Sequence, residues 1–224
     1  LLQDDKCLVL DPKTGRTLQT FSLPAQPDGE RPHWAYIGVY EDRLIAGASF
    51  VGYSSRLRPA GEKADPFRPF VDKSASKSLV MMNRYDGTVL WSVDAEEGFL
   101  HNGIVAGDGK VFCLDTAPPY ARRYAGSDQS HTARLLSIDI RTGRTIWENR
   151  DCAFGSWLSL SDRFGILLQA HRKSRDMLWE PGDRMAAFRA ETGEVLWDRE
   201  MEYTGPVMLR ADTVFTQESA YNLL

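Results

Sequence analysis

The sequence contains no long hydrophobic run. Nowhere do its 224 residues reach the roughly eighteen consecutive apolar residues that a membrane-spanning helix needs. The first residues, LLQDDKCLVLD, lack a basic segment followed by an apolar one, so they do not read as a signal peptide. We therefore expect no transmembrane helix, and we expect this start to lie inside a longer protein.

Cysteine is scarce as well. Cys7, Cys113 and Cys152 are odd in number and belong to no CxxC pair, so neither a zinc site nor a disulfide framework is indicated. We expect buried thiols at these positions. Familiar catalytic motifs are also missing: there is no GxSxG, no HExxH and no phosphate-binding loop, and GDGK at 107–110 reads as a hairpin turn.

The composition is that of an ordinary globular protein, with 42% apolar and 26% charged residues. A chain of 224 residues can bury the core of one large domain. The net charge of −4 argues against a general nucleic-acid-binding protein.

A turn containing glycine recurs along the chain. An apolar run precedes each turn, and a Leu or Ile stands three residues after each glycine, which are Gly15, Gly87, Gly143 and Gly193. A tryptophan follows four residues after the last three of them, as Trp91, Trp147 and Trp197. The first copy has Gln19 at that place and Phe21 two residues further on. Each copy predicts a β-hairpin whose turn needs a residue at positive φ.

A second pattern of a short apolar strand, a polar turn and another apolar strand lies between these hairpins. Together the two patterns make units of four strands, about fifty residues long where loops are short, which is typical of β-propeller blades. The sequence therefore predicts an all-β propeller of three complete blades and two partial ones. The predicted boundaries are about 1–31 (partial), 32–94, 100–150, 155–200 and 205–224 (partial).

Two arrangements of these blades are open. The N-terminal hairpin and the C-terminal strands could pair and close a four-bladed ring, or the chain could be a segment of a larger propeller. The ending SAYNLL carries no turn or closing strand, which favours the segment. An open segment leaves unpaired sheet edges, which natural sheets avoid.

The motifs DIRTGRTIW (139–147) and RAETGEVLW (189–197) resemble the tryptophan-docking repeat of the quinoprotein-like β-propellers. That superfamily includes pyrroloquinoline-quinone dehydrogenases and the propeller lipoprotein of the bacterial outer-membrane assembly machine. The resemblance implies that each indole ring lies across the interface with the next blade, over its glycine turn. It also implies a periplasmic or extracellular bacterial protein.

Three long connections, at 51–77, 116–131 and 171–183, are predicted on one face of the propeller. Loops of this length are commonly functional in compact domains. The first contains six basic against three acidic residues, and aromatic residues are interleaved in all three. Arginine and aromatic side chains suit an anionic ligand, a glycan or a protein partner. The docking candidates are Arg56, Arg58, Tyr120, Arg122, Arg123, Arg172, Arg175 and Trp179.

Polar and aromatic residues also stand at the starts of the predicted inner strands. The resemblance implies that such residues line the central funnel, where propellers commonly bind ligands. The funnel candidates are His33, Trp34, His101, Asn102, Ser156, Trp157 and Tyr203. The pair His101 and Asn102 is the strongest of them.

Two functions are implied by the resemblance. The leading hypothesis is a noncatalytic binding or scaffold module with no cofactor, which presents its loop-rich face to a protein, glycan or anionic ligand. The alternative is a quinone-dependent dehydrogenase of alcohols or sugars, or a degenerate relative, holding pyrroloquinoline quinone and calcium near His101, Asn102 and Trp157. Such dehydrogenases carry two adjacent cysteines over the quinone, and this chain departs from that pattern.

Overall fold

The computed structural model describes residues 1–223 except for residue 4 and the segments 26–28, 52–72, 119–131 and 173–179. The regular elements of these residues are all strands. They are β1 (Leu2–Gln3), β2 (Lys6–Leu10), β3 (Thr17–Ser22), β4 (Trp34–Tyr40), β5 (Arg43–Phe50), β6 (Ala75–Asn83), β7 (Val89–Gly107), β8 (Lys110–Thr116), β9 (Ala133–Asp139), β10 (Thr145–Asn149), β11 (Trp157–Ser161), β12 (Ile166–Ala170), β13 (Arg184–Arg189), β14 (Val195–Glu200), β15 (Met208–Arg210), β16 (Thr213–Phe215) and β17 (Ala220–Asn222).

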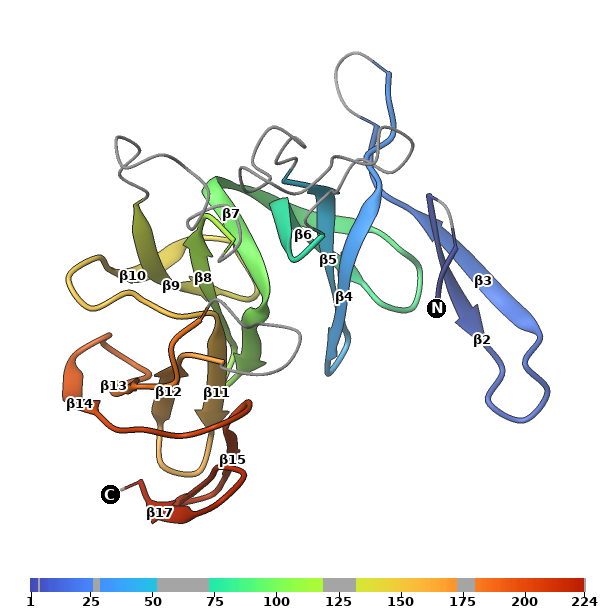
Figure 1. Ribbon diagram of the computed structural model, residues 1–224. Coiled ribbons are helices and arrows are strands. Elements are labelled where there is room, and N and C mark those ends of the chain that lie inside the picture. Colours follow the sequence, from blue (N-terminus) through green and yellow to red (C-terminus); the bar gives the residue numbers. More distant parts are fainter. Residues whose placement is uncertain (4, 26–28, 52–72, 119–131, 173–179, 224) are drawn as a thin grey trace, which may run out of the picture.

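All pairing between neighbouring strands is antiparallel, and the sheets follow one another along an arc (Figure 1). We call the sheet β1–β3 blade 1 and the sheet β15–β17 blade 5. Strands β11–β14 form blade 4. The remaining sheet has the order β10-β9-β8-β7-β6-β5-β4 and contains two blades, blade 2 from β4 to the first half of β7 and blade 3 from the second half of β7 to β10. The expected propeller of antiparallel blades is confirmed.

The long strand β7 joins blades 2 and 3 where the sequence suggested a break near residues 94–100. Its first half pairs with β6 up to Asp94. After a register shift, Phe99 and Leu100 pair with Ser76 and Ala75 at the start of β6. On its other side β7 pairs with β8, at Phe99 and then from Ile104 to Gly107. One strand therefore serves as the outer strand of one blade and the inner strand of the next.

The two ends of the arc do not meet. Among the strands that the structure describes, β1–β3 and β15–β17 belong to separate sheets. The N- and C-terminal ends of the chain lie at opposite ends of the arc (Figure 1). The arrangement is that of a partial propeller, and the closed four-bladed ring is not formed.

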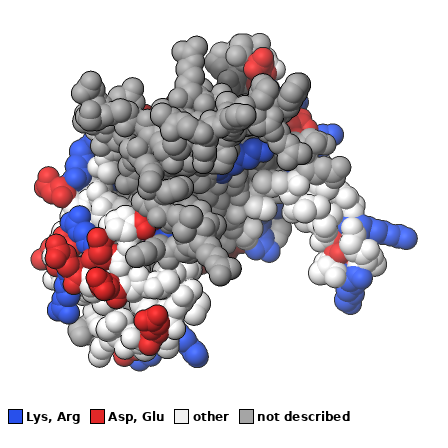
Figure 2. All heavy atoms as spheres, in the orientation of Figure 1, with Lys and Arg blue, Asp and Glu red and all other residues white. Residues whose placement is uncertain are grey.

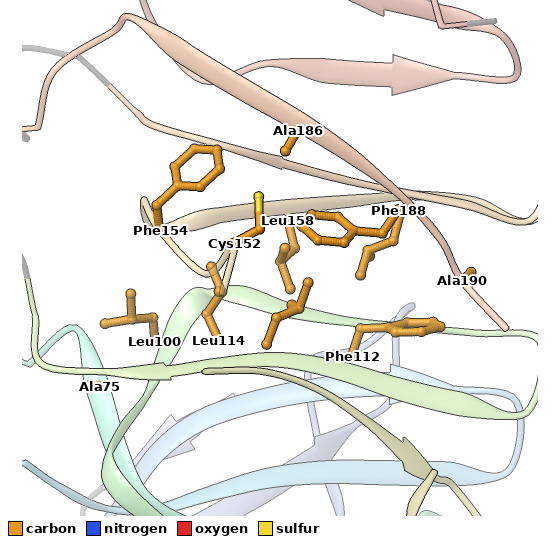
Figure 3. Close-up of a cluster of buried hydrophobic side chains, with 12 residues drawn as sticks. Ala75, Leu100, Phe112, Leu114, Cys152, Phe154, Leu158, Ala186, Phe188 and Ala190 are labelled. Carbon is orange, nitrogen blue, oxygen red and sulfur yellow. The ribbon is translucent and has the colours of Figure 1, made fainter. Parts of the chain in front are cut away.

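The core consists of one hydrophobic layer between each pair of neighbouring blades. Because successive side chains of a strand point to opposite faces, a middle strand of a blade serves two layers. On β6, Leu79 and Met81 pack toward blade 3, whereas Val80 and Met82 pack toward blade 1. The layer between blades 3 and 4 places Phe112 and Leu114 against Leu158 and Phe188 (Figure 3). This double burial explains why middle strands such as β5, β12 and β13 are nearly continuous buried runs.

Candidate functional site

Aromatic rings connect each blade to the glycine turn of the next. A Cβ atom added to Gly143 would lie 2.8 Å from the Trp91 ring, and one added to Gly193 would lie 2.6 Å from the Trp147 ring. Both glycines have positive φ, at 72° and 74°. Only glycine combines this φ with room for so close a ring, so the glycine and the tryptophan in these repeats depend on one another.

The first repeat uses a different ring in the same way. A Cβ atom on Gly87 would lie 2.6 Å from Phe21, whereas Gln19 occupies the place that holds tryptophan in the later copies. A phenylalanine two residues further along β3 therefore covers the turn of blade 2. Sequence spacing alone did not assign this contact to Phe21.

Each indole also donates a hydrogen bond to the next blade. Trp91 Nε1 donates to the carbonyl of Ile140 at 2.9 Å, and Trp147 Nε1 donates to that of Ala190 at 3.0 Å. Trp197 Nε1 donates to the carbonyl of Leu223 at 3.2 Å in blade 5. The rings are thus fixed by packing on one side and by a polar anchor at the tip.

Several of the funnel candidates are used inside the fold. Trp34 is buried in the layer between blades 1 and 2, and Trp157 packs against the layer between blades 4 and 5. Ser156 is buried and donates to Glu180 at 2.5 Å. The Tyr203 hydroxyl lies 2.9 Å from the carbonyl oxygens of His171 and Arg184, and burial raises the pKa of its phenol. The structure does not bring these four side chains together in one cavity.

Two aromatic rings lie next to His101. Its ring centroid is 5.7 Å from that of Tyr36 and 6.2 Å from that of Phe50, and its Nε2 lies 2.9 Å from the Ser76 hydroxyl. The neighbouring Asn102 is exposed, as is His33 at the start of blade 2. Among the funnel candidates, His101 has the most polar and aromatic neighbours that the structure describes.

A cleft of about 600 Å³ opens beside a second histidine, His171, which directly follows β12 in blade 4. An adjoining hollow of about 340 Å³ shares part of its lining and reaches Tyr203 and Glu218 in blade 5. We call the two together the His171 cleft. The larger part is lined by His171, Pro181, Asp183, Arg184, Glu200, Met201 and Glu202.

The His171 cleft is acidic. Among the described residues of its lining the arginine is Arg184, which donates two hydrogen bonds to Asp198, at 2.9 and 2.6 Å, so the charge of Arg184 is largely matched by that partner. The carboxylates of Asp183, Glu200 and Glu202 therefore dominate the lining. Acidic side chains gather on the part of the surface over β13 and β14, whereas basic ones mark the tip of the β2–β3 hairpin (Figures 1 and 2).

Several side-chain contacts hold the inner wall of the cleft. The His171 ring meets Phe154 edge-on at 5.1 Å, and its Nδ1 lies 3.0 Å from Asp183 Oδ1. The Arg184 guanidinium lies 4.1 Å from the centroid of the Phe154 ring. The hydrogen bonds from Arg184 lower the pKa of the Asp198 carboxyl. The Cys152 thiol contacts Asp198 at 3.3 Å, and burial, with this carboxylate, raises its pKa to about 11.

Blade 3 contains a buried carboxylate that the sequence analysis missed. Asp115, at the end of β8, accepts the backbone N–H groups of residues 96, 97 and 98 at 2.7, 3.0 and 2.8 Å. Arg134, opposite it on β9, pairs with the same carboxylate at 2.7 Å. This clamp holds the middle of β7 extended. An Asp at the end of an apolar strand, facing an Arg on the next, was the available signal.

The acidic run at 94–99 also takes part in ion pairs. Glu96 contacts Arg134 at 3.0 Å and Arg150 at 2.8 Å, and the hydrogen bond from Arg150 lowers the pKa of the Glu96 carboxyl. These contacts link β7 of blade 3 to its outer strand.

Most of the predicted loop-face residues lie outside the residues that the structure describes. These are Arg56, Arg58, Tyr120, Arg122, Arg123, Arg175 and Trp179. Arg172 is described, and its backbone N–H donates to the buried Glu180 at 2.7 Å. The docking role of this face stays a prediction.

The three cysteines lie apart from one another in the fold. Cys7, Cys113 and Cys152 are free and buried in three different layers between blades, so no two of them can lie together over a cofactor. No three His, Cys, Asp or Glu side chains of the described segments are grouped closely enough to hold a metal ion. Within those segments there is also no helix long and apolar enough to cross a membrane.

Several solved structures are similar to this chain. A computationally designed protein, Ika4, matches with a TM-score of 0.52 at 12% identity, covering 91% of this chain and 96% of its own. The Pan2 WD40 domain of Neurospora crassa matches with a TM-score of 0.50 at 12% identity over 96% of this chain. Hsv2 of Kluyveromyces lactis matches with a TM-score of 0.55 at 5% identity over 98%.

The chain spans 52% of the Pan2 domain and 55% of Hsv2, or about half the length of each. At such low identities the likeness shows the fold alone. A search of curated proteins found no match. The family comparison agrees with the repeats of glycine and tryptophan: a family model described as "Outer membrane protein assembly factor BamB" matches residues 3–223, and the chain belongs to this PQQ_2 family of β-propellers.

Proposed function

We propose that this chain is a noncatalytic binding module that uses the His171 cleft, which includes described residues of the connection at 171–183, to hold a protein partner. The family description points to a role in protein assembly at the outer membrane, and with it to a periplasmic location. Fold alone does not determine function, so the proposal depends on the cleft.

The observation that carries the proposal is the charge of the cleft. Asp183, Glu200 and Glu202 line it, while Arg184 is engaged by Asp198. A surface of this kind favours a partner segment rich in Lys or Arg, because complementary charges speed association and exclude acidic competitors. The anionic or glycan ligand expected for the loop face would bind elsewhere on that face.

The interior residues favour binding over catalysis. Ser156 and Tyr203, which could have served as reactive groups, are buried and hydrogen-bonded within the fold. We assign Gly87, Gly143 and Gly193, with Trp91, Trp147 and Trp197, the structural docking role that the family resemblance implies.

The test uses three peptides of equal length, one rich in arginine, one rich in glutamate and one uncharged, with binding measured by calorimetry. We expect the arginine-rich peptide alone to bind. The double variant Glu200→Lys/Glu202→Lys should weaken its binding about tenfold or more, since it reverses two charges of the lining.

The matched control is Glu191→Lys/Glu194→Lys, which makes the same change of net charge on the exposed glycine turn of the same blade. It should leave binding nearly unchanged. Equal losses in both double variants would attribute binding to overall charge and would contradict the proposal. Reduction of a dye upon addition of pyrroloquinoline quinone and calcium would replace it with the dehydrogenase alternative.

A further inference from the structure

Two carboxylates of one outer strand lie within reach of Arg184. Glu200 of β14 is the direct neighbour of Arg184 across the β13–β14 pair, whereas Asp198 lies diagonally opposite, since its own direct neighbour is Ala186. Asp198 and Glu200 are two residues apart, so their side chains lie on the same face of the sheet as that of Arg184. By position alone, the guanidinium can pair with either carboxylate.

Arg184 pairs with the diagonal carboxylate. Its Nε and Nη2 donate to Oδ1 and Oδ2 of Asp198, at 2.9 and 2.6 Å, while the guanidinium lies 4.1 Å from the centroid of the Phe154 ring. Within the part of the chain that the structure describes, Glu200 forms no ion pair. Glu200 lines the cleft, and Asp198 does not. The carboxylate that the cleft presents is therefore the one that Arg184 leaves unpaired.

Blade 3 has a basic residue at the position of Glu200. Counted from the tryptophan of each outer strand, Arg150 corresponds to Glu200, and Glu148 corresponds to Asp198. Glu148 pairs with both Arg150 and Arg134, so it lies between two cations. In blade 4 the second of these cations is replaced by a carboxylate, and one arginine faces two acidic side chains. Which of the two it pairs with decides the charge of the cleft.

We propose that Asp198 determines the specificity of the His171 cleft, because it holds Arg184 away from Glu200. This inference rests on the proposed function and adds to it a residue outside the lining. Without a carboxylate at position 198, the guanidinium would pair with Glu200, its direct neighbour across the strands. That pair would cancel a negative charge that attracts a basic partner segment. Asp198 is thus a positioning residue, which acts on the partner through Arg184.

The test measures binding of the arginine-rich peptide by calorimetry. Asp198→Asn should weaken binding about fivefold, as much as Glu200→Gln, because each variant removes the available charge at Glu200. The double variant Arg184→Gln/Asp198→Asn lacks the guanidinium that would cover Glu200, so its affinity should return to within about twofold of that of the parent chain. Such a rescue is not expected if Asp198 only supports the fold.

The matched control is Glu194→Gln, at the other end of β13. Glu194 pairs with Arg189 at 3.0 Å in the exposed glycine turn of the same blade. The variant therefore makes the same change of net charge and also releases an arginine from its carboxylate, but not in the lining of the cleft. It should leave binding of the peptide unchanged. Thermal melting of each variant shows whether it is folded.

Three results would overturn this inference while the proposed function stands, since the parent chain binds the peptide in all of them. They are equal binding by Asp198→Asn and the parent, failure of the double variant to regain affinity, and equal weakening by Glu194→Gln and Asp198→Asn. Absence of binding to the parent chain would overturn the proposed function, and this inference with it.

Discussion

Blades 3 and 4 carry an arginine at the same point of the same strand, and they differ in what faces it. Arg134 lies near the start of β9 and Arg184 begins β13, and each contacts a carboxylate on the outer strand, Glu148 or Asp198. In blade 3 the arginine also binds Asp115, whose carboxylate clamps the backbone of residues 96–98.

In blade 4 the residue that stands opposite the arginine, as Asp115 does in blade 3, is His171. The backbone N–H of His171 donates to the carbonyl of Arg184. In blade 4 a side-chain donor, and not an acceptor, holds the segment that enters the blade. The Gln169 amide donates to the carbonyl of Phe154 at 2.6 Å. Exchange of the clamping carboxylate for a histidine accompanies an open cleft. The candidate site therefore lies where blade 4 departs from the closed arrangement of blade 3.

The largest expected effect comes from separating the two blades. Trp147→Ala removes the ring that covers Gly193 and its hydrogen bond to Ala190, so the free energy of unfolding should fall by about 3 kcal/mol. Ile146→Ala, at an exposed neighbour on the same strand, should change it by less than about 0.5 kcal/mol. Denaturant unfolding measures both. Similar small losses would show that the ring does not hold the interface.

The next effect concerns Asp115, whose carboxylate holds the backbone of residues 96–98 in blade 3. Asp115→Asn replaces a carboxylate that accepts three N–H groups and pairs with Arg134, so we expect a loss of about 2.5 kcal/mol. Asp183→Asn, in the open position, alters a side chain that is 60% exposed and should cost less than about 0.5 kcal/mol. Urea titration of the two variants compares them directly. Equal losses would remove the distinction between the blades.

A smaller effect separates backbone strain from ring contact. Gly193→Ala combines φ of 74° with a methyl group 2.6 Å from Trp147, and should cost about 2 kcal/mol. Gly109→Ala, in the β7–β8 turn of blade 3, has φ of 68° with nothing within 4 Å, and should cost about 1 kcal/mol. Melting temperatures of the two variants give the difference. No difference would mean that φ alone selects glycine in the repeat.

The smallest effect is the part of the pH dependence of stability that Asp198 of blade 4 contributes. Hydrogen bonds from Arg184 lower the pKa of Asp198 below its usual 3.8, so this group stabilises the fold at higher pH. The contribution is lost as the pH falls from about 3.8 through the folded-state pKa. Asp198→Asn should therefore be less stable than the parent at about pH 6, and the gap should narrow at about pH 3. A gap that stays constant between these two pH values in denaturant unfolding would contradict this assignment.

The sequence was informative where a contact depends on spacing. The interval from glycine to tryptophan placed Trp91 and Trp147 at the interfaces, since the blade repeats and the strand register follows the turn. The prediction of the funnel residues depended instead on the direction in which each side chain points. Trp34 and Trp157 stand at strand starts, and the alternation of side chains sends them into the layers between blades.

Contacts between distant segments could not be predicted from spacing. Asp115 meets a backbone segment that lies 17 to 19 residues earlier in the chain, and only the sheet register brings them together. The His171 cleft likewise needs residues from the ends of β12 and β14 and from the Pro181–Asp183 segment. Spacing alone predicted that this face carries loops, but it could not determine that the described part of it is acidic.

The three buried thiols make each of the first three interfaces chemically addressable. Cys7, Cys113 and Cys152 lie in the layers between blades 1 and 2, 2 and 3, and 3 and 4, and burial raises the pKa of each. Because the thiolate is the reactive form, labelling must wait until a layer opens to water. Mass spectrometry after timed alkylation would thus give the order in which the blades come apart, with no engineered reporter.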